Sequence, residues 1–215
     1  LEDYHENDLA EVFPDLTIVE RRKICRILDT EMLSDIFEHI DEKPAAEYLD
    51  EMDVRKAAKI LSSMETDAVI DVLKMIPKEK RALLIELTDA DTREDIAVIA
   101  SFDDEEIGSR MTTNFIMIRE NLTVKQAMSS LVEQAAKNDN ISTIFMVTED
   151  QTFYGAMDLK DLIIARQDSP LEDLVVTSYP YVYGHELIDD CIEKLKDYSE
   201  DSIPVLNNNN KLLGV

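Results

Sequence analysis

Two aspartates, Asp67 and Asp71, stand four residues apart in the segment Glu65-Thr-Asp-Ala-Val-Ile-Asp71. Residues four apart share one face of an α-helix, so their carboxylates lie close together and repel unless a cation stands near them. Hard divalent cations prefer oxygen ligands, so carboxylates placed in this way could hold one. A solvated helix face has the same pattern, and the pair taken alone favours that interpretation over a cation site.

Other side chains capable of chemistry are scattered along the chain. His5, His39 and His185 are widely separated and lack the spacing of metal ligands. We find no Gly-rich phosphate loop, no Cys pair for zinc and no nucleophile with a neighbouring base. The four acids 103–106 are expected to form a solvated linker face rather than a metal site. The sequence therefore predicts no enzyme.

Composition narrows the class of protein further. The 215 residues include 22 Lys and Arg against 47 Asp and Glu, a formal net charge of -25. Such a field repels nucleic acid and anionic lipid and attracts cations or basic partners, although acidity also serves solubility. Cys25 and Cys191 are expected to be core residues of a protein in a reducing compartment. Neither a bilayer-spanning run nor a secretion signal is visible, so the chain is expected to be cytosolic.

A repeat of twelve residues must position the aspartate pair. Residues suited to begin a helix recur at this interval, and an apolar residue precedes all but the last of them. These residues are Thr17, Asp29, Asp41, Asp53, Glu65, Pro77 and Asp89. Helices of two or three turns are not stable alone in water, so consecutive units must stack as a helical solenoid.

The pattern of apolar residues supports the repeat and then changes. Pairs such as Ile60 with Met64 and Leu84 with Leu87 predict buried helical stripes. After Met111 the sequence predicts strand, helix, strand, strand, helix, with strands at 115–118, 143–147 and 153–157. The first of these helices begins with a capping box at Thr123 and is expected to bury Val124, Met128 and Val132 on one face.

The same order of elements begins again near Tyr179, with strands at 181–183, 202–206 and 211–215 and a helix at 186–198. We therefore expect an acidic all-helical domain at 1–101, a linker at 102–110, one α+β copy at 111–170 and a second at 171–215. The second copy is expected to be incomplete, because an apolar strand stops in mid-pattern at Val215.

The two α+β copies resemble a pair of cystathionine-beta-synthase (CBS) domains. The resemblance rests on Met111-Thr112 before a strand, on Gly155-Ala-Met-Asp-Leu-Lys-Asp161, and on Ser202-Ile-Pro-Val with Leu-Leu-Gly-Val215. Such pairs can hold adenine nucleotides, which makes ATP a further expected ligand and Asp161 its ribose contact. Asp158 stands where nucleotide-binding copies usually have Ser or Thr for phosphate, so a helix N-cap is its expected role.

With the acidic superhelix and the Glu-Ile-Gly-Ser-Arg-Met-Thr linker in front of the pair, the whole chain resembles the cytosolic part of MgtE-type magnesium transporters. The resemblance implies that the superhelix and the CBS pair close on each other around Mg²⁺ and so hold a membrane pore shut. It implies metal-site roles for Asp67, Asp71, Glu47, Gly108, Ser109, Asp189 and Asp190. Ser199 replaces one acid of the family, and further family acids lie beyond Val215.

The sequence thus predicts an α-helical superhelix followed by a tandem CBS pair, acting as the Mg²⁺-sensing regulatory region of a magnesium transporter or channel. The resemblance implies a homodimer through the CBS domains, located at the cytoplasmic face of the membrane and attached to a transmembrane pore domain. An adenine-nucleotide-sensing CBS module of an enzyme or another transporter is the alternative. A scaffold similar to parts of the flagellar motor switch is a third, which the CBS pair disfavours.

Overall fold

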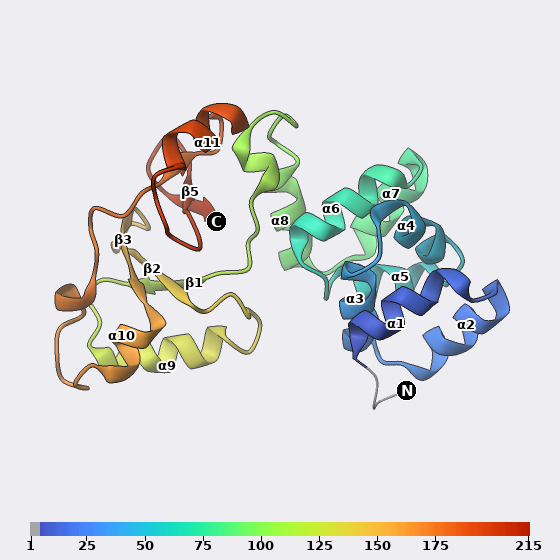
Figure 1. The fold of residues 1–215 in the computed structure, drawn as a ribbon, viewed down its shortest axis with the longest axis horizontal. Helices are drawn as coiled ribbons and strands as arrows, with labels where there is room; N and C mark the ends of the chain where they lie inside the picture. The colour runs from blue at the N-terminus through green and yellow to red at the C-terminus, as the bar shows by residue number, and fades with distance from the viewer. Residues whose placement is uncertain (1–4) are drawn as a thin grey trace. The chain divides into compact units, whose positions relative to one another are not determined.

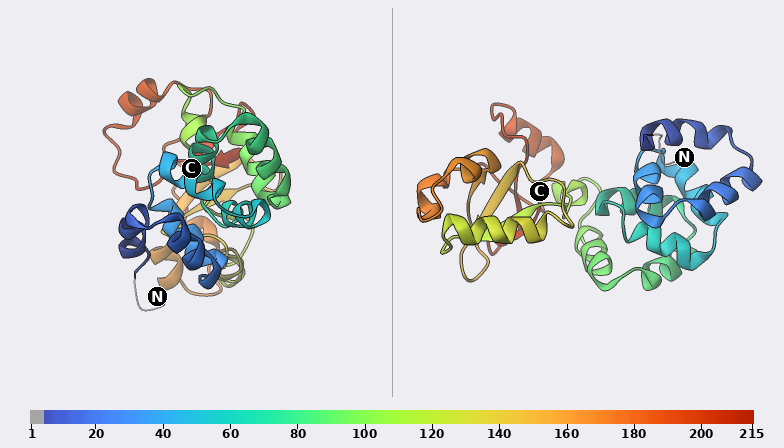
Figure 2. Two further views of the ribbon diagram at one scale, coloured as in Figure 1. Left: turned by 90° about the vertical axis from the view of Figure 1, so that its right-hand side faces the viewer. Right: turned by 90° about the horizontal axis from the view of Figure 1, so that it is seen from below.

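The computed structural model describes residues 5–215 and divides into two compact units (Figure 1). The first unit ends at Ala97 and the second runs from Val98 to Val215. The first is entirely helical, and the second carries both sheets, as further views also show (Figure 2).

The helical unit is a series of short helices. They are α1 (Glu6–Val12), the 3₁₀ turn η1 (Phe13–Asp15), α2 (Ile18–Ile27), α3 (Thr30–Glu38), α4 (Glu42–Asp50), α5 (Val54–Leu61), α6 (Thr66–Met75), α7 (Lys78–Leu87) and α8 (Ala90–Ile99). All seven helix starts predicted from the repeat are confirmed: six are N-cap residues, and Asp89 directly precedes α8 and accepts a hydrogen bond from the backbone N–H of Thr92 at 2.8 Å.

Only some of these starting residues cap their helix with a side chain. Thr17 forms a complete capping box with Glu20, and Asp29 and Asp53 accept backbone N–H groups of α3 and α5. Asp41 and Glu65 occupy the N-cap without a side-chain capping bond. The spacing of the repeat is therefore kept by backbone geometry even where the capping bond is missing.

Helices two positions apart in the sequence pack on each other. Contacts join α1 to α3, α3 to α5, α5 to α7 and α4 to α6, which gives the layered stack of a solenoid. Its core includes fully buried Leu33, Ile36, Phe37, Leu49, Ile60, Leu61 and Leu84. Of the two residues predicted to form the buried stripe on α7, Leu84 is fully buried, but the prediction is wrong for Leu87, which is 39% exposed.

The fourth residue after each helix start distinguishes inner from outer repeats. In the inner repeats it is apolar and fully buried: Leu33, Ala45, Ala57 and Val69. In the outer repeats it is an arginine whose guanidinium donates to the carbonyl just before the helix start: Arg21 to Leu16, Arg81 to Ile76 and Arg93 to Thr88. These arginines donate to carbonyls at the end of the preceding helix, where the helix itself offers no N–H partner.

The second unit contains two copies of one supersecondary pattern. The first copy has β1 (Ile116–Arg119), α9 (Val124–Gln134), β2 (Thr143–Val147), β3 (Phe153–Asp158) and α10 (Leu159–Ile164), and the second has β4 (Val182–Tyr183), α11 (Ile188–Leu195), β5 (Val205–Leu206) and β6 (Leu212–Gly214). The 3₁₀ turns η2 (Ile107–Arg110) and η3 (Leu171–Leu174) precede the two copies. The predicted order of elements is confirmed, although α11 is shorter than predicted.

Both sheets share one topology. In each, the first strand pairs in parallel with the second, and the second pairs antiparallel with the third. The turn before the third strand places Gln151 in one copy and Asn210 in the other at positive φ, 67° and 58°. A side chain of α9 departs from the prediction: Val124 is buried, but Val132 is 64% exposed.

The leading segment of each copy pairs with the other copy. Thr112 and Val215 exchange both backbone hydrogen bonds, at 2.9 and 3.0 Å, and Ala156 pairs with Val176 in the same way. A Cβ on Gly155 would stand 2.7 Å from the carbonyl oxygen of Val176, so only glycine permits this approach. The two copies therefore form one interlocked body.

Candidate functional site: acidic residues of the two units

Asp67 and Asp71 both lie on α6, as predicted, but their surroundings differ. Asp67 is in the first turn of the helix, where the N-terminal end of the helix dipole favours a negative charge. Its Oδ1 is buried and has no hydrogen-bond partner among the described residues. Asp71 is partly exposed and pairs with Lys74, whose Nζ lies 3.0 Å from Oδ1. Asp67 is thus the more unusual of the two carboxylates.

The buried oxygen of Asp67 fits a cation in its chemistry. Buried carboxylate oxygens are nearly always hydrogen-bonded, because leaving one without a partner costs free energy. A hydrated divalent cation could supply such a partner directly or through a coordinated water. Glu47, also predicted as a ligand, is exposed on α4, the helix that packs against α6. Within residues 5–215, no three His, Cys, Asp or Glu side chains come together as a metal centre.

The predicted linker residues lie in η2. Gly108 is buried and its N–H donates to the carbonyl of Gly184 at 2.9 Å, while the Ser109 hydroxyl donates to the carbonyl of Glu106 at 2.8 Å. The Ser109 oxygen keeps acceptor capacity for a ligand. The solvated linker face predicted for 103–106 holds for its first three acids, but Glu106 is partly buried and contacts His185.

Asp189 and Asp190 are exposed in the first turn of α11. Asp161 is partly exposed in the first turn of α10, and Asp158 is the N-cap of that helix but makes no side-chain capping bond. A cavity of about 340 Å³ opens between the two copies and is lined by both polar and apolar groups, among them Arg110, Thr112 and Ser202. Asp161 does not line this cavity.

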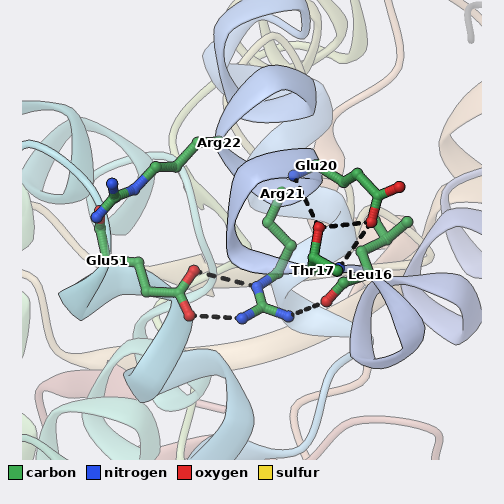
Figure 3. Close-up of polar contacts among 6 residues, drawn as sticks. All are labelled: Leu16, Thr17, Glu20, Arg21, Arg22 and Glu51. Carbon is green, nitrogen blue, oxygen red and sulfur yellow. Dashed lines mark hydrogen bonds and ion pairs between the residues drawn. The ribbon is translucent and has the colours of Figure 1, made fainter.

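One cluster of charged side chains on the helical unit was not predicted from any pattern in the sequence. Arg21 forms a two-pronged ion pair with Glu51, with Nε–Oε2 at 3.1 Å and a second N–O contact at 2.5 Å (Figure 3). The hydrogen bonds that the guanidinium donates to Glu51 raise the pKa of Arg21 above its ordinary value, and the guanidinium also lies 4.3 Å from the centre of the Tyr48 ring. Because these charges satisfy one another, we assign the cluster to stability rather than to binding.

Cys25 and Cys191 are buried free thiols, as predicted, and burial raises the pKa of Cys191 to about 11, so its thiol is unreactive. Among the described residues, no helix combines the length and the apolar character needed to cross a bilayer.

A helical solenoid followed by two interlocked α+β copies defines the class: a tandem CBS-domain protein with a helical domain in front. The family profile described as the MgtE intracellular N domain matches residues 4–105, and that of the CBS domain matches residues 105–168 and 171–215. The chain belongs to the CBS-domain family, whose profile matches just over half of its residues, and it carries in front of the CBS pair a segment that matches the MgtE intracellular N domain.

Curated proteins with similar sequences agree with this assignment. The magnesium transporter MgtE of Thermus thermophilus is 30% identical over the whole chain, which covers 48% of that protein. That of Enterococcus faecalis is 29% identical over 56% of this chain and 27% of its own length. The chain thus spans about half, or less, of the curated relatives it matches.

Solved structures support the fold. The soluble part of a magnesium transporter is similar with a TM-score of 0.91 and 27% identity, covering 98% of this chain and 83% of that one. The cytosolic domain of the Mg²⁺ channel MgtE in complex with ATP has a TM-score of 0.89 at 24% identity, with 99% and 87% coverage. The recognition from sequence and the predicted fold class are therefore confirmed.

Proposed function

We propose that this chain is the cytosolic, Mg²⁺-sensing regulatory region of a magnesium transporter or channel. In this proposal Mg²⁺ bridges acidic surfaces of the helical unit and the CBS pair and favours the closed state of a pore. The pore domain lies in the membrane, the regulatory region at its cytoplasmic face, and the assembly is a homodimer through the CBS domains. Catalysis is no part of the proposal. The buried, unpartnered Oδ1 of Asp67 is the observation that carries it.

The energies needed are small enough for weak sites. Two carboxylates about 6 Å apart repel by roughly 0.7 kcal/mol in water and about 3 kcal/mol at an effective dielectric near 20. Moving a conformational equilibrium from 1:99 to 99:1 takes about 5.5 kcal/mol of differential binding. A few ions that bind only the closed state therefore suffice, with ligands drawn from Asp67, Asp71, Glu47, Gly108, Ser109, Asp189 and Asp190.

Thermal unfolding in rising Mg²⁺ tests this proposal. A ligand of the folded state stabilises it by about 2.7 kcal/mol at a hundred times its dissociation constant. We expect Mg²⁺ to raise the melting temperature, and the double variant Asp67→Asn, Asp71→Asn to lose most of that rise. The matched control Glu79→Gln, Glu86→Gln removes the same charge from exposed positions of α7 and keeps the rise.

Two further solutions separate binding from screening. NaCl at matched ionic strength screens surface charges without coordinating them, and Ca²⁺ tests selectivity by ion size. An equal Mg²⁺ response in the aspartate variant and in the α7 control rules out Asp67 and Asp71 as ligands.

The cavity between the two copies favours adenine nucleotide as a second candidate ligand, since Arg110 lines it and could pair with a phosphate. The similar Mg²⁺ channel domain solved with ATP supports the same proposal. Titration calorimetry with ATP and AMP tests it, with Arg110→Ala against Arg119→Ala, an exposed arginine of β1. Nucleotide binding that ignores substitution of Asp67 and Asp71 favours a nucleotide-sensing module. Asp161 lies outside this cavity, so its role as a ribose contact stays a prediction from the sequence.

A further inference from the structure

The acidic linker lies along the second CBS copy, although in sequence it adjoins the first. The N–H of Ile107 donates to the carbonyl of Glu186, and the N–H of Gly108 donates to the carbonyl of Gly184, both at 2.9 Å. In return, the N–H of Ile188 donates to the carbonyl of Glu105 at 3.0 Å. The linker and the loop 184–188 therefore hold each other through backbone bonds in both directions.

One of these bonds completes helix α11. The first N–H groups of a helix have no partner within it, and they usually bond to a capping side chain. Leu187, the N-cap residue of α11, has no such side chain. The carbonyl of Glu105 takes over this role by accepting the N–H of Ile188, the first residue of the helix. Release of the linker leaves this end of α11 without its cap.

Phe102 fastens the start of the linker. A Cβ added to Gly108 would stand 2.6 Å from Cδ2 and Cγ of the Phe102 ring. A Cβ added to Gly184 would stand 2.6 Å from Cε1 of the same ring. The ring centre also lies 4.9 Å from that of His185. Phe102 thus fills a space that exists because one linker residue and one residue of the second copy lack side chains.

A polar pair lies beside the ring. Glu106 accepts the N–H of Asp103 through Oε2 at 2.9 Å, and its Oε1 lies 2.9 Å from Nδ1 of His185. The Glu106 side chain is 19% exposed, although its three acidic neighbours are exposed. The contact bridges the linker to the loop that already bonds its backbone.

We propose that residues 102–110 are a docked part of the second CBS copy, which Phe102 latches in place without any metal or nucleotide. Movement of the helical unit relative to the CBS pair then begins on the N-terminal side of Phe102, while Gly108 and Ser109 keep their place against the second copy. This inference goes beyond the proposed function and does not depend on Mg²⁺.

Hydrogen exchange followed by NMR in chelator tests the latch at the amides of Ile107, Gly108 and Ile188. We expect Phe102→Ala to speed their exchange at least tenfold while the amides of β2 keep their rates. Phe153→Ala, which removes another half-buried aromatic ring of the same unit, serves as the matched control and leaves the three amides unchanged.

A double variant identifies the contact itself. Gly184 is not at positive φ, and every atom within 3.4 Å of its added Cβ belongs to Phe102. Gly184→Ala is therefore expected to release the linker in the native background and to add nothing in the Phe102→Ala background. The inference is overturned by native exchange rates in Phe102→Ala, by an equal acceleration in β2, or by a further tenfold effect of Gly184→Ala in the double variant.

Discussion

The helical unit and the CBS pair differ in the sequence separation of the contacts that stabilise each of them. A cap such as Asp29 bonds a backbone N–H three residues away, and helices α1, α3, α5 and α7, like α4 and α6, pack on their second neighbours. In the CBS pair, Thr112 bonds Val215 at the far end of the unit, and the linker bonds the loop at 184–188. The first arrangement lets one repeat weaken by itself, whereas the second makes the copies depend on each other.

The largest effect is expected in the core of the solenoid. Leu33→Ala removes a fully buried side chain from an inner repeat and is expected to destabilise the helical unit by about 3 kcal/mol. Urea unfolding followed by a probe in each unit measures it. The unfolding transition of the CBS pair should stay in place, and a parallel shift of both transitions would contradict the separation of the two units.

A somewhat smaller effect is expected where the copies interlock. Gly155→Ala forces a Cβ against the backbone of Val176, which cannot move aside without breaking the pairing of the copies. Overpacking of this kind costs about 2 kcal/mol, and we expect the loss in the unfolding of the CBS pair alone. Asp173→Ala, an exposed substitution in η3, is the control and should change the free energy of unfolding by less than about 0.5 kcal/mol.

The outer repeats should respond less than the inner ones at the same repeat position. Arg93→Ala removes hydrogen bonds to the carbonyls of Glu86 and Thr88, which we expect to cost about 1.5 kcal/mol. Arg93→Lys keeps the charge but loses the forked geometry, so it should recover only part of that loss. A loss in Arg93→Ala as large as that in Leu33→Ala would refute the distinction between inner and outer repeats.

The smallest predicted effect concerns pH and the linker. A backbone hydrogen bond from Asp103, with the contact to His185, lowers the pKa of Glu106 below its ordinary value of 4.5. A carboxylate with a lowered folded pKa contributes fully above its ordinary value and loses that contribution as pH falls through the folded pKa. Protection of the Ile107 amide should therefore fall several-fold below pH 4.5, corrected for intrinsic exchange. Glu106→Gln should show no such fall.

Local rules predicted much of the fold. The twelve-residue spacing located every helix start from Thr17 to Asp89, because the N-cap depends on residues within one turn. Periodicity alone did not identify which apolar residues are buried. Val132 follows Val124 by eight residues, a rotation of about 80° from the buried face, and it is exposed.

The candidate site was predictable only in part. The i, i+4 spacing placed Asp67 and Asp71 on one helix, but the burial that leaves Asp67 Oδ1 without a partner depends on tertiary packing. Phe102 and His185 come together across 83 positions of sequence without any repeat or motif to signal it. The metal roles of all seven predicted site residues, and the boundaries at 101 and 110, stay predictions.

Small-angle X-ray scattering during a Mg²⁺ titration tests the central claim most directly, because closure of two units lowers the radius of gyration. The proposal predicts a smaller radius for the native chain in Mg²⁺ than in chelator, and a much weaker change for Asp67→Asn, Asp71→Asn. The Glu79→Gln, Glu86→Gln control should respond like the native chain. A native radius of gyration that is the same in chelator and in saturating Mg²⁺ would contradict the account.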